Sequence, residues 1–142
     1  MYQYKAKVNR IIDGDSVVLD IDLGFDMWIK KQNVRIHGID TPECRTRDLD
    51  EKARGLMAKS HVKDLLQIGE KVTINTYRDK AGKFGRILGK VINIEGIDIG
   101  QSLLDNHLAV EYYGQSKDEI KEQHLENRSI LILEQRYTPN ED

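Results

Sequence analysis

The stretch that decides the fold is residues 13–24, DGDSVVLDIDLG. It opens on an Asp-Gly pair, which is a common signal for a tight turn between two strands. From residue 17 the side chains alternate between apolar and mostly polar, with the two-residue period of a strand that buries one face. The face expected to be buried carries Val17, Leu19, Ile21 and Leu23. The stretch therefore predicts a half-buried strand that begins directly after a turn.

Similar alternation recurs on both sides of this stretch and predicts a mainly β protein. Further strands are expected over residues 4–12, 27–37, 70–77 and 86–94, with a short one around 109–112. A helix is expected to interrupt them, beginning after the capping residue Asp48 and ending at Gly69. Shorter helical patterns follow at residues 99–106 and from residue 117. This order favours an α+β fold, a five-stranded oligonucleotide-binding (OB-fold) Greek-key barrel with about three α-helices packed on it.

Length and composition predict a single domain. The 142 residues are 39% hydrophobic and 32% charged, which is enough apolar material for one core. We expect one domain over residues 1–142, with residues 117–142 forming a C-terminal helix that docks on it. The net charge is −2, whereas domains that bind nucleic acid tightly are usually basic. This balance argues against tight stoichiometric DNA binding, but it is compatible with an enzyme that must release a nucleic-acid product.

The chain has the features of an intracellular protein. No apolar run approaches the roughly 18 residues needed to cross a bilayer, so no membrane association is expected. The N-terminal residues lack the apolar segment of a secretory signal. The single cysteine, Cys44, cannot form an internal disulfide. These features predict a cytoplasmic location, and they give no reason to infer an obligate protein partner.

Three short segments carry candidate chemistry. Residues 13–16, DGDS, are by themselves most simply a turn, although Asp15 could offer a hard carboxylate oxygen to a cation. Residues 35–43, RIHGIDTPE, place one arginine and two carboxylates close together. That arrangement suits either a solvated loop or a phosphate clamp with a metal ligand and a base. Residues 84–86, FGR, put an arginine at the start of a strand. Each signal alone is weak, and only their combination points to a site.

In this order, and with the sequence GRILG at residues 85–89, the three segments resemble the staphylococcal-nuclease (thermonuclease) family. The resemblance extends over about residues 5–113 and is most specific at residues 40–43, DTPE. It implies an OB-fold barrel that is a calcium-dependent phosphodiesterase, an endonuclease that hydrolyses DNA and RNA to 5′-hydroxyl and 3′-phosphate ends. A small cleft that must reach a single backbone phosphate would also favour single strands over a stiff duplex.

The same resemblance implies a calcium site made of oxygen ligands. Asp15 and Asp40 match the family's metal carboxylates, and Thr41 matches the residue that contributes its main-chain carbonyl. Two carboxylates, one carbonyl, a phosphate oxygen and waters form a suitable shell, since Ca²⁺ takes about six to eight oxygen ligands. Magnesium would fit the charge but tolerates loose geometry less well.

Three further positions match the family's catalytic residues. Arg35 and Arg86 match the arginines that hold the scissile phosphate, where a planar guanidinium binds the oxygens more strongly as negative charge builds up. Glu43 matches the carboxylate beside the attacking water. One substrate contact departs from the family pattern, because Phe84 replaces a tyrosine. The substrate contacts that remain expected are Lys83 and Tyr113, with Tyr112 as the alternative to Tyr113.

More than one interpretation stays open. The favoured one is an active nuclease, because all the metal and catalytic positions are intact. The alternative is a non-catalytic module of the same fold that binds nucleic acid or protein, which the net charge and Phe84 favour. A plain OB-fold barrel without metal is weaker, since it leaves the placement of the carboxylates unexplained. No part in the chemistry is expected for the lone cysteine, or for the histidines, whose spacing is not that of metal ligands. These residues are Cys44, His37, His61, His107 and His124.

Overall fold

The computed structural model describes residues 2–77 and 86–139. Seven strands and three helices lie in this part of the chain. In chain order they are β1 (Tyr2–Asp13), β2 (Ser16–Asp22), β3 (Trp28–Ile36), β4 (Ile39–Asp40), α1 (Leu49–Leu65), β5 (Lys71–Tyr77), β6 (Ile87–Ile92), α2 (Ile99–Asp105), β7 (Val110–Glu111) and α3 (Lys117–Leu133).

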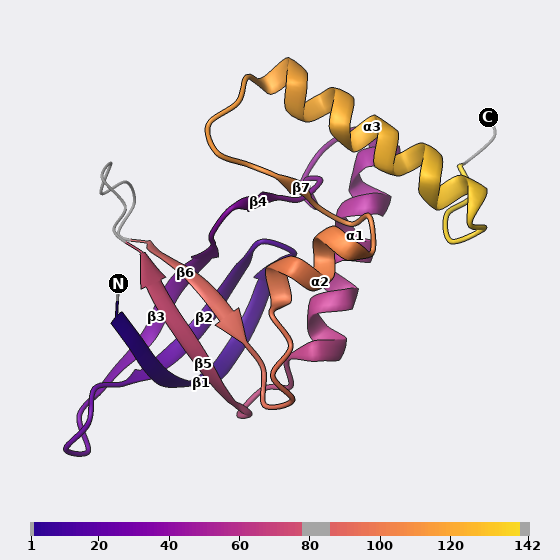
Figure 1. Ribbon diagram of the computed structural model, residues 1–142. Coiled ribbons are helices and arrows are strands. Elements are labelled where there is room, and N and C mark those ends of the chain that lie inside the picture. The colour runs from indigo at the N-terminus through magenta and orange to yellow at the C-terminus, as the bar shows by residue number, and fades with distance from the viewer. Residues whose placement is uncertain (1, 78–85, 140–142) are drawn as a thin grey trace.

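Five of the strands close into a barrel in the order β1-β2-β3-β6-β5, with β5 pairing back to β1 (Figure 1). Only the β3–β6 pair is parallel among these barrel strands, and the other pairs are antiparallel. A closed barrel leaves no unpaired sheet edge, which a short strand-rich chain needs to avoid aggregation. The predicted α+β fold, a five-stranded barrel with three helices, is confirmed.

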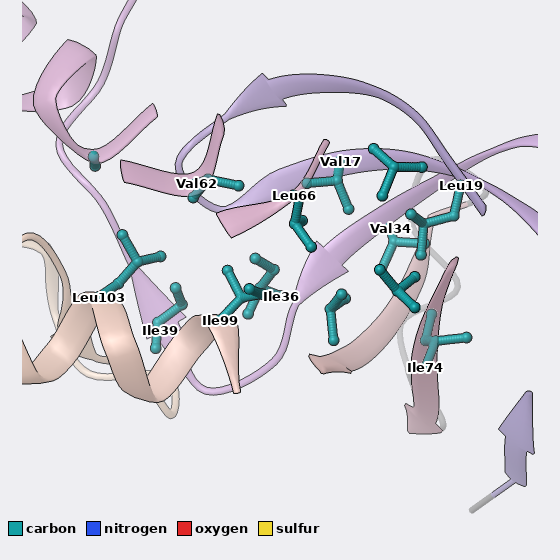
Figure 2. Packing of buried hydrophobic residues seen from close by; sticks show 14 of the residues in the cluster. Val17, Leu19, Val34, Ile36, Ile39, Val62, Leu66, Ile74, Ile99 and Leu103 are labelled. Atoms are coloured by element: carbon teal, nitrogen blue, oxygen red, sulfur yellow. The ribbon is translucent and has the colours of Figure 1, made fainter. Parts of the chain in front are cut away.

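The barrel interior is filled by the apolar face of each strand, as the alternation predicts. Val17, Val34 and Ile74 are each at most 1% exposed, and the first two face each other in the β2–β3 register. Helices α1 and α2 cover one end of the barrel and add Val62, Ile99 and Leu103 to the same cluster, together with Leu66 at the C-cap of α1 (Figure 2). Leu23 differs from the prediction because β2 ends at Asp22, so this leucine lies in the following turn and is 40% exposed.

A second, two-stranded sheet connects the barrel with the helices (Figure 1). It pairs β4 with β7, so that Ile39 lies opposite Glu111 and Asp40 lies opposite Val110. The sequence had predicted no strand at residues 39–43. Strand β4 has only two residues, which is too short to show alternation in the sequence, so only its pairing with β7 reveals it. This pairing fixes the backbone of Asp40.

Capping residues set where the helices begin. The Asp48 side chain accepts hydrogen bonds from the backbone N–H groups of Asp50 and Glu51, which confirms it as the N-cap of α1. In a full capping box the Glu51 side chain would accept a hydrogen bond from the Asp48 backbone N–H. Here that N–H donates to Thr46 Oγ1 instead. Helix α1 ends at Leu65, a turn earlier than the predicted end at Gly69.

Helix α3 lies beside β7 and the first part of α1 (Figure 1). Its buried face carries Leu131, which is 1% exposed, while Leu133 at its end is 82% exposed. Asn127 Nδ2 donates to the carbonyl of Ala109 at 3.0 Å, and Arg128 Nε lies 2.9 Å from Asp50 Oδ2. The helix stops at Leu133, short of the predicted 142. That residues 1–142 form one domain stays a prediction.

Among the helices in residues 2–77 and 86–139, none combines the length and the apolar character that a bilayer crossing requires.

Asp50 is the group through which α3 is held to α1, and it makes the attachment sensitive to pH. Its carboxylate accepts hydrogen bonds from Arg128 Nε and the Tyr137 hydroxyl, and Arg54 lies 3.4 Å away. Burial alone would raise the pKa of Asp50, but the bonds from Tyr137 and Arg128 outweigh it and lower that pKa. The ionised carboxylate therefore stabilises the fold above its unfolded pKa, and this contribution is lost as pH falls through the lower folded pKa.

We expect Asp50→Asn to lower the free energy of unfolding at neutral pH by on the order of 1–2 kcal/mol, because hydrogen bonds to a charged group are lost. The difference from the wild type should shrink at an acid pH below this lowered folded-state pKa, where the wild-type carboxylate is itself protonated. Urea unfolding at both pH values measures this, with the exposed Asp64→Asn on the same helix as control. A difference that is the same at both pH values would contradict the assignment.

Candidate active site

An open cleft of about 400 Å³ lies beside the barrel where β1–β2, β3, β4 and the start of β6 meet. It brings together five of the predicted site residues, which come from distant parts of the chain. The residues that line it are Asp13, Asp15, Ser16, Arg35, Asp40, Glu43, Arg86 and Tyr112. A neighbouring cavity of about 440 Å³ between α1 and α3 shares Asp40, Glu43 and Tyr112 and also has Thr41 in its lining.

The barrel register explains why Asp15 and Arg35 meet. Ser16 pairs with Arg35 across the β2–β3 ladder, and the Ile36 N–H donates to the Asp15 carbonyl at 2.8 Å. Both side chains therefore leave neighbouring strands at the same end of the barrel. Asp40 follows β3 by one short turn and is fixed by its β7 partner. Backbone pairing alone thus places two carboxylates around one arginine.

Arg35 is the central cation of this arrangement. Its Nη1 lies 2.8 Å from Asp15 Oδ2, and its Nη2 lies 3.6 Å from Asp40 Oδ1 and donates to the Ile39 carbonyl at 3.2 Å. Burial alone would lower the pKa of Arg35, but the charge of Asp15 and its hydrogen bond raise it. The guanidinium is therefore permanently charged, and its fork is held in a fixed plane by three oxygen partners.

The cleft has an excess of negative charge. Among the described residues, four acidic and two basic side chains line it. Glu43 shows the effect: burial raises its pKa, and the charges of Asp15, Asp40 and Asp13 raise it further. Such a cluster is electrostatically unfavourable by itself and favours a bound cation.

The residues present fit a hard divalent cation. Asp15 and Asp40 offer carboxylate oxygens, Thr41 follows Asp40 directly and is only 4% exposed, and oxygen donors of these kinds are what Ca²⁺ and Mg²⁺ take. Within residues 2–77 and 86–139, no three His, Cys, Asp or Glu side chains converge closely enough to hold a metal by themselves. The predicted set has only two carboxylates, so it depends on the Thr41 carbonyl and on ligands from solvent and substrate.

The predicted phosphate and substrate contacts differ in where they lie relative to the cleft. Arg86 lines the cleft at the start of β6, whereas Lys83 lies outside the described residues. Tyr112, the alternative, lines the cleft. Tyr113 does not appear in that lining; its ring lies edge-on to His37, with the centroids 6.2 Å apart, and it is 71% exposed. A substrate role for Tyr113 stays a prediction, and any such contact would be made outside the cleft.

One residue at this site was missed by the sequence analysis. His124 on α3 places its Nε2 2.8 Å from Asp40 Oδ2, and its side chain is 11% exposed. The two residues are 84 positions apart, so no spacing rule could have paired them. The nearest sequence signal was a histidine inside a polar helix, which is usually a packing residue.

The fold is an OB-fold-like barrel with a cleft of carboxylates and arginines beside it, and comparison with known proteins gives its family. A sequence model of the family described as "Staphylococcal nuclease homologue" matches residues 33–130. Because the match covers more than half of the chain, the protein belongs to this family, and membership implies a divalent metal ion.

The particular relatives are nucleases by name. The chain is 28% identical over 116 residues to Endonuclease YhcR of Bacillus subtilis (strain 168), covering 78% of this chain and 9% of that protein. It is 30% identical over 111 residues to Thermonuclease of Staphylococcus hyicus, covering 78% of this chain and 58% of that protein. It is 33% identical over 84 residues to Thermonuclease of Staphylococcus intermedius, covering 59% and 46%. The chain thus spans about half the length of these two thermonucleases and a small part of the endonuclease.

Cys44, which follows Glu43, has the surroundings of an unreactive thiol. It is 8% exposed, and burial, the charge of Asp13 and a hydrogen bond to Asp13 raise its pKa to about 11. Since the thiolate is the nucleophile, alkylation by iodoacetamide near pH 8 should be slow in the folded protein and fast in guanidinium. Mass spectrometry over time measures both rates. Equal rates would show that Cys44 is accessible and ionised, which contradicts the structure.

Proposed function

We propose that this chain is a calcium-dependent nuclease that hydrolyses phosphodiester bonds of DNA and RNA to 5′-hydroxyl and 3′-phosphate ends. The observation that carries the proposal is the convergence of Asp15, Arg35, Asp40, Glu43 and Arg86 on one cleft. Family membership supports it, because the relatives named above are called nucleases.

Each residue in the cleft suits one part of this reaction. Arg35 and Arg86 would bind the non-bridging oxygens of the phosphate, with attraction that grows as negative charge builds during attack. Glu43 would orient a water molecule and accept its proton. The water oxygen then bonds to phosphorus, the bond from phosphorus to the 5′ oxygen breaks, and that oxygen takes a proton from solvent water to leave as the 5′-hydroxyl. A calcium ion held by Asp15, Asp40 and Thr41 would supply positive charge beside one phosphate oxygen.

The test is digestion of a short labelled single-stranded DNA with added calcium and with a chelator. We expect cleavage that requires calcium, products with the ends given above, and a severe loss of rate in Glu43→Gln, which keeps the shape but not the basicity of the side chain. Arg47→Gln is a matched control, because Arg47 is exposed and lies outside the cleft lining. Binding of the DNA without calcium-dependent cleavage would reject the nuclease and favour the non-catalytic module.

The cleft also predicts which substrates are cut fastest. A cleft of about 400 Å³ can reach one backbone phosphate, but none of the described lining residues belongs to an element shaped to read a groove, so frayed or single strands should be cut faster than perfect duplex. Rates should fall with salt along a shallow slope, because Arg35 and Arg86 are the basic residues among the described part of the lining. Initial rates on matched single-stranded and duplex oligonucleotides measure the preference, and equal rates would contradict it.

A further inference from the structure

We propose that His124 is a positioning residue for the cation site: its imidazole holds one oxygen of the Asp40 carboxylate so that the other oxygen is presented to the metal. The inference rests on the proposed metal site and adds a residue of α3 to it. His124 would touch neither the metal nor the substrate. It would act only through Asp40.

The two oxygens of the Asp40 carboxylate have different partners, His124 and Arg35. Oδ2 lies 2.8 Å from His124 Nε2, and since an ionised carboxylate has no hydrogen to give, the imidazole N–H is the donor. Oδ1 lies on the side of Arg35, whose Nη2 is 3.6 Å away. The backbone of Asp40 is itself fixed opposite Val110. Rotation of the carboxylate is therefore opposed at Oδ2, and Oδ1 is left on the side of Arg35, which lines the cleft.

Helix α3 holds the imidazole in place before any cation arrives. Three and four residues further along the same helix, Asn127 donates to the Ala109 carbonyl and Arg128 pairs with Asp50. Residues at these spacings share a helix face, so His124 is carried by the same face that docks. The imidazole is also nearly buried, with 11% of its side chain exposed. Little conformational freedom is left for it to lose on cation binding.

Prior orientation of a ligand raises affinity because the carboxylate does not have to be ordered at the moment of binding. Removing the hydrogen-bond partner of a metal ligand typically costs about 10–100-fold in metal affinity. A purely structural role for His124 predicts a different result for calcium affinity. If His124 served only to attach α3, its loss would lower stability but leave the affinity of the folded protein for calcium unchanged.

The experiment is calorimetric titration of the folded protein with calcium chloride, without substrate, on the wild type and on matched variants. His124→Leu removes the donor and should weaken calcium binding by about 10–100-fold. His124→Gln carries an amide nitrogen at a similar reach and should recover most of the affinity. His124→Asn is too short to reach Oδ2, so it should behave like the leucine variant and replaces it if leucine prevents folding. Asn127→Ala removes one docking contact of α3 but keeps the Arg128 contact and the imidazole, so it should lose much less calcium affinity than His124→Leu.

The outcomes separate this inference from the proposed function. If the wild type binds no calcium, the proposed metal site and this inference both fail. If the wild type binds calcium and His124→Leu and His124→Asn bind it equally well, only the positioning role fails. If Asn127→Ala loses as much affinity as His124→Leu, docking of α3 is sufficient and His124 has no separate role. Loss in the leucine and asparagine variants, with recovery in glutamine, supports the proposal.

Discussion

Arg35→Ala is expected to lower the rate of cleavage by about 10²–10³-fold, with a much smaller effect on substrate binding. The guanidinium is held by Asp15, Asp40 and the Ile39 carbonyl before substrate arrives, so its donors are already fixed in direction. Charge on the phosphate oxygens grows only as water attacks, and a fixed donor therefore acts mainly on the transition state. Single-turnover cleavage of a labelled oligonucleotide measures the rate directly.

Two further measurements isolate the role of the guanidinium. Arg35→Lys should not restore the rate, because an ammonium cannot reproduce the planar fork. Calcium affinity should not fall in Arg35→Ala, since removing a cation from between Asp15 and Asp40 leaves both carboxylates more available to a metal. If Arg35→Ala turned over normally, the cleft would not be the site of phosphodiester chemistry.

The barrel was predictable because its strands bury one face each. Alternation at positions such as Val17 and Leu19 reports that burial directly in the sequence, and Asp48 showed where α1 begins. A short strand around residues 109–112 was predicted, and β7 confirms it, but its partner β4 was not predicted, because two residues are too few for a period to appear. The positions of the barrel strands could thus be predicted from the local sequence pattern. The β4–β7 pairing that fixes Asp40 could not.

In the site, too, residues carried by short motifs could be predicted, whereas a residue brought in by tertiary packing could not. Asp15, Arg35, Asp40 and Glu43 were predicted because short motifs carry them, and the structure brings them to one cleft, while their roles stay a prediction. The choice between Tyr112 and Tyr113 depends on which face of β7 and its continuation each side chain takes, and that follows from the register with β4. His124 reaches the site through tertiary packing alone, so only the structure could reveal it.

Gly55 lies where α1 packs directly against the backbone of Pro42 and Glu43. A methyl group at this glycine would lie 2.6 Å from the Glu43 carbonyl oxygen and 2.7 Å from the Pro42 carbonyl oxygen. Both atoms belong to backbone, which cannot move aside as a flexible side chain can. In an exposed helix, alanine would be favoured over glycine by about 1 kcal/mol. Here we expect the opposite sign, a loss of about 1–3 kcal/mol from overpacking.

Gly55→Ala should also lower the cleavage rate, because the loop can relieve the clash only by moving Glu43, and a misplacement of about 1 Å can cost 10²-fold. Gly100→Ala on α2 is the matched control: its methyl would meet a side-chain carbon of the buried Ile36 at 3.1 Å, a less severe contact than the 2.6 Å at Gly55, and Gly100 lies outside the cleft lining. Urea unfolding and single-turnover cleavage of both variants test the two effects together. Stability and rate at wild-type levels in Gly55→Ala would mean that the loop tolerates displacement, and that close packing of α1 does not position Glu43.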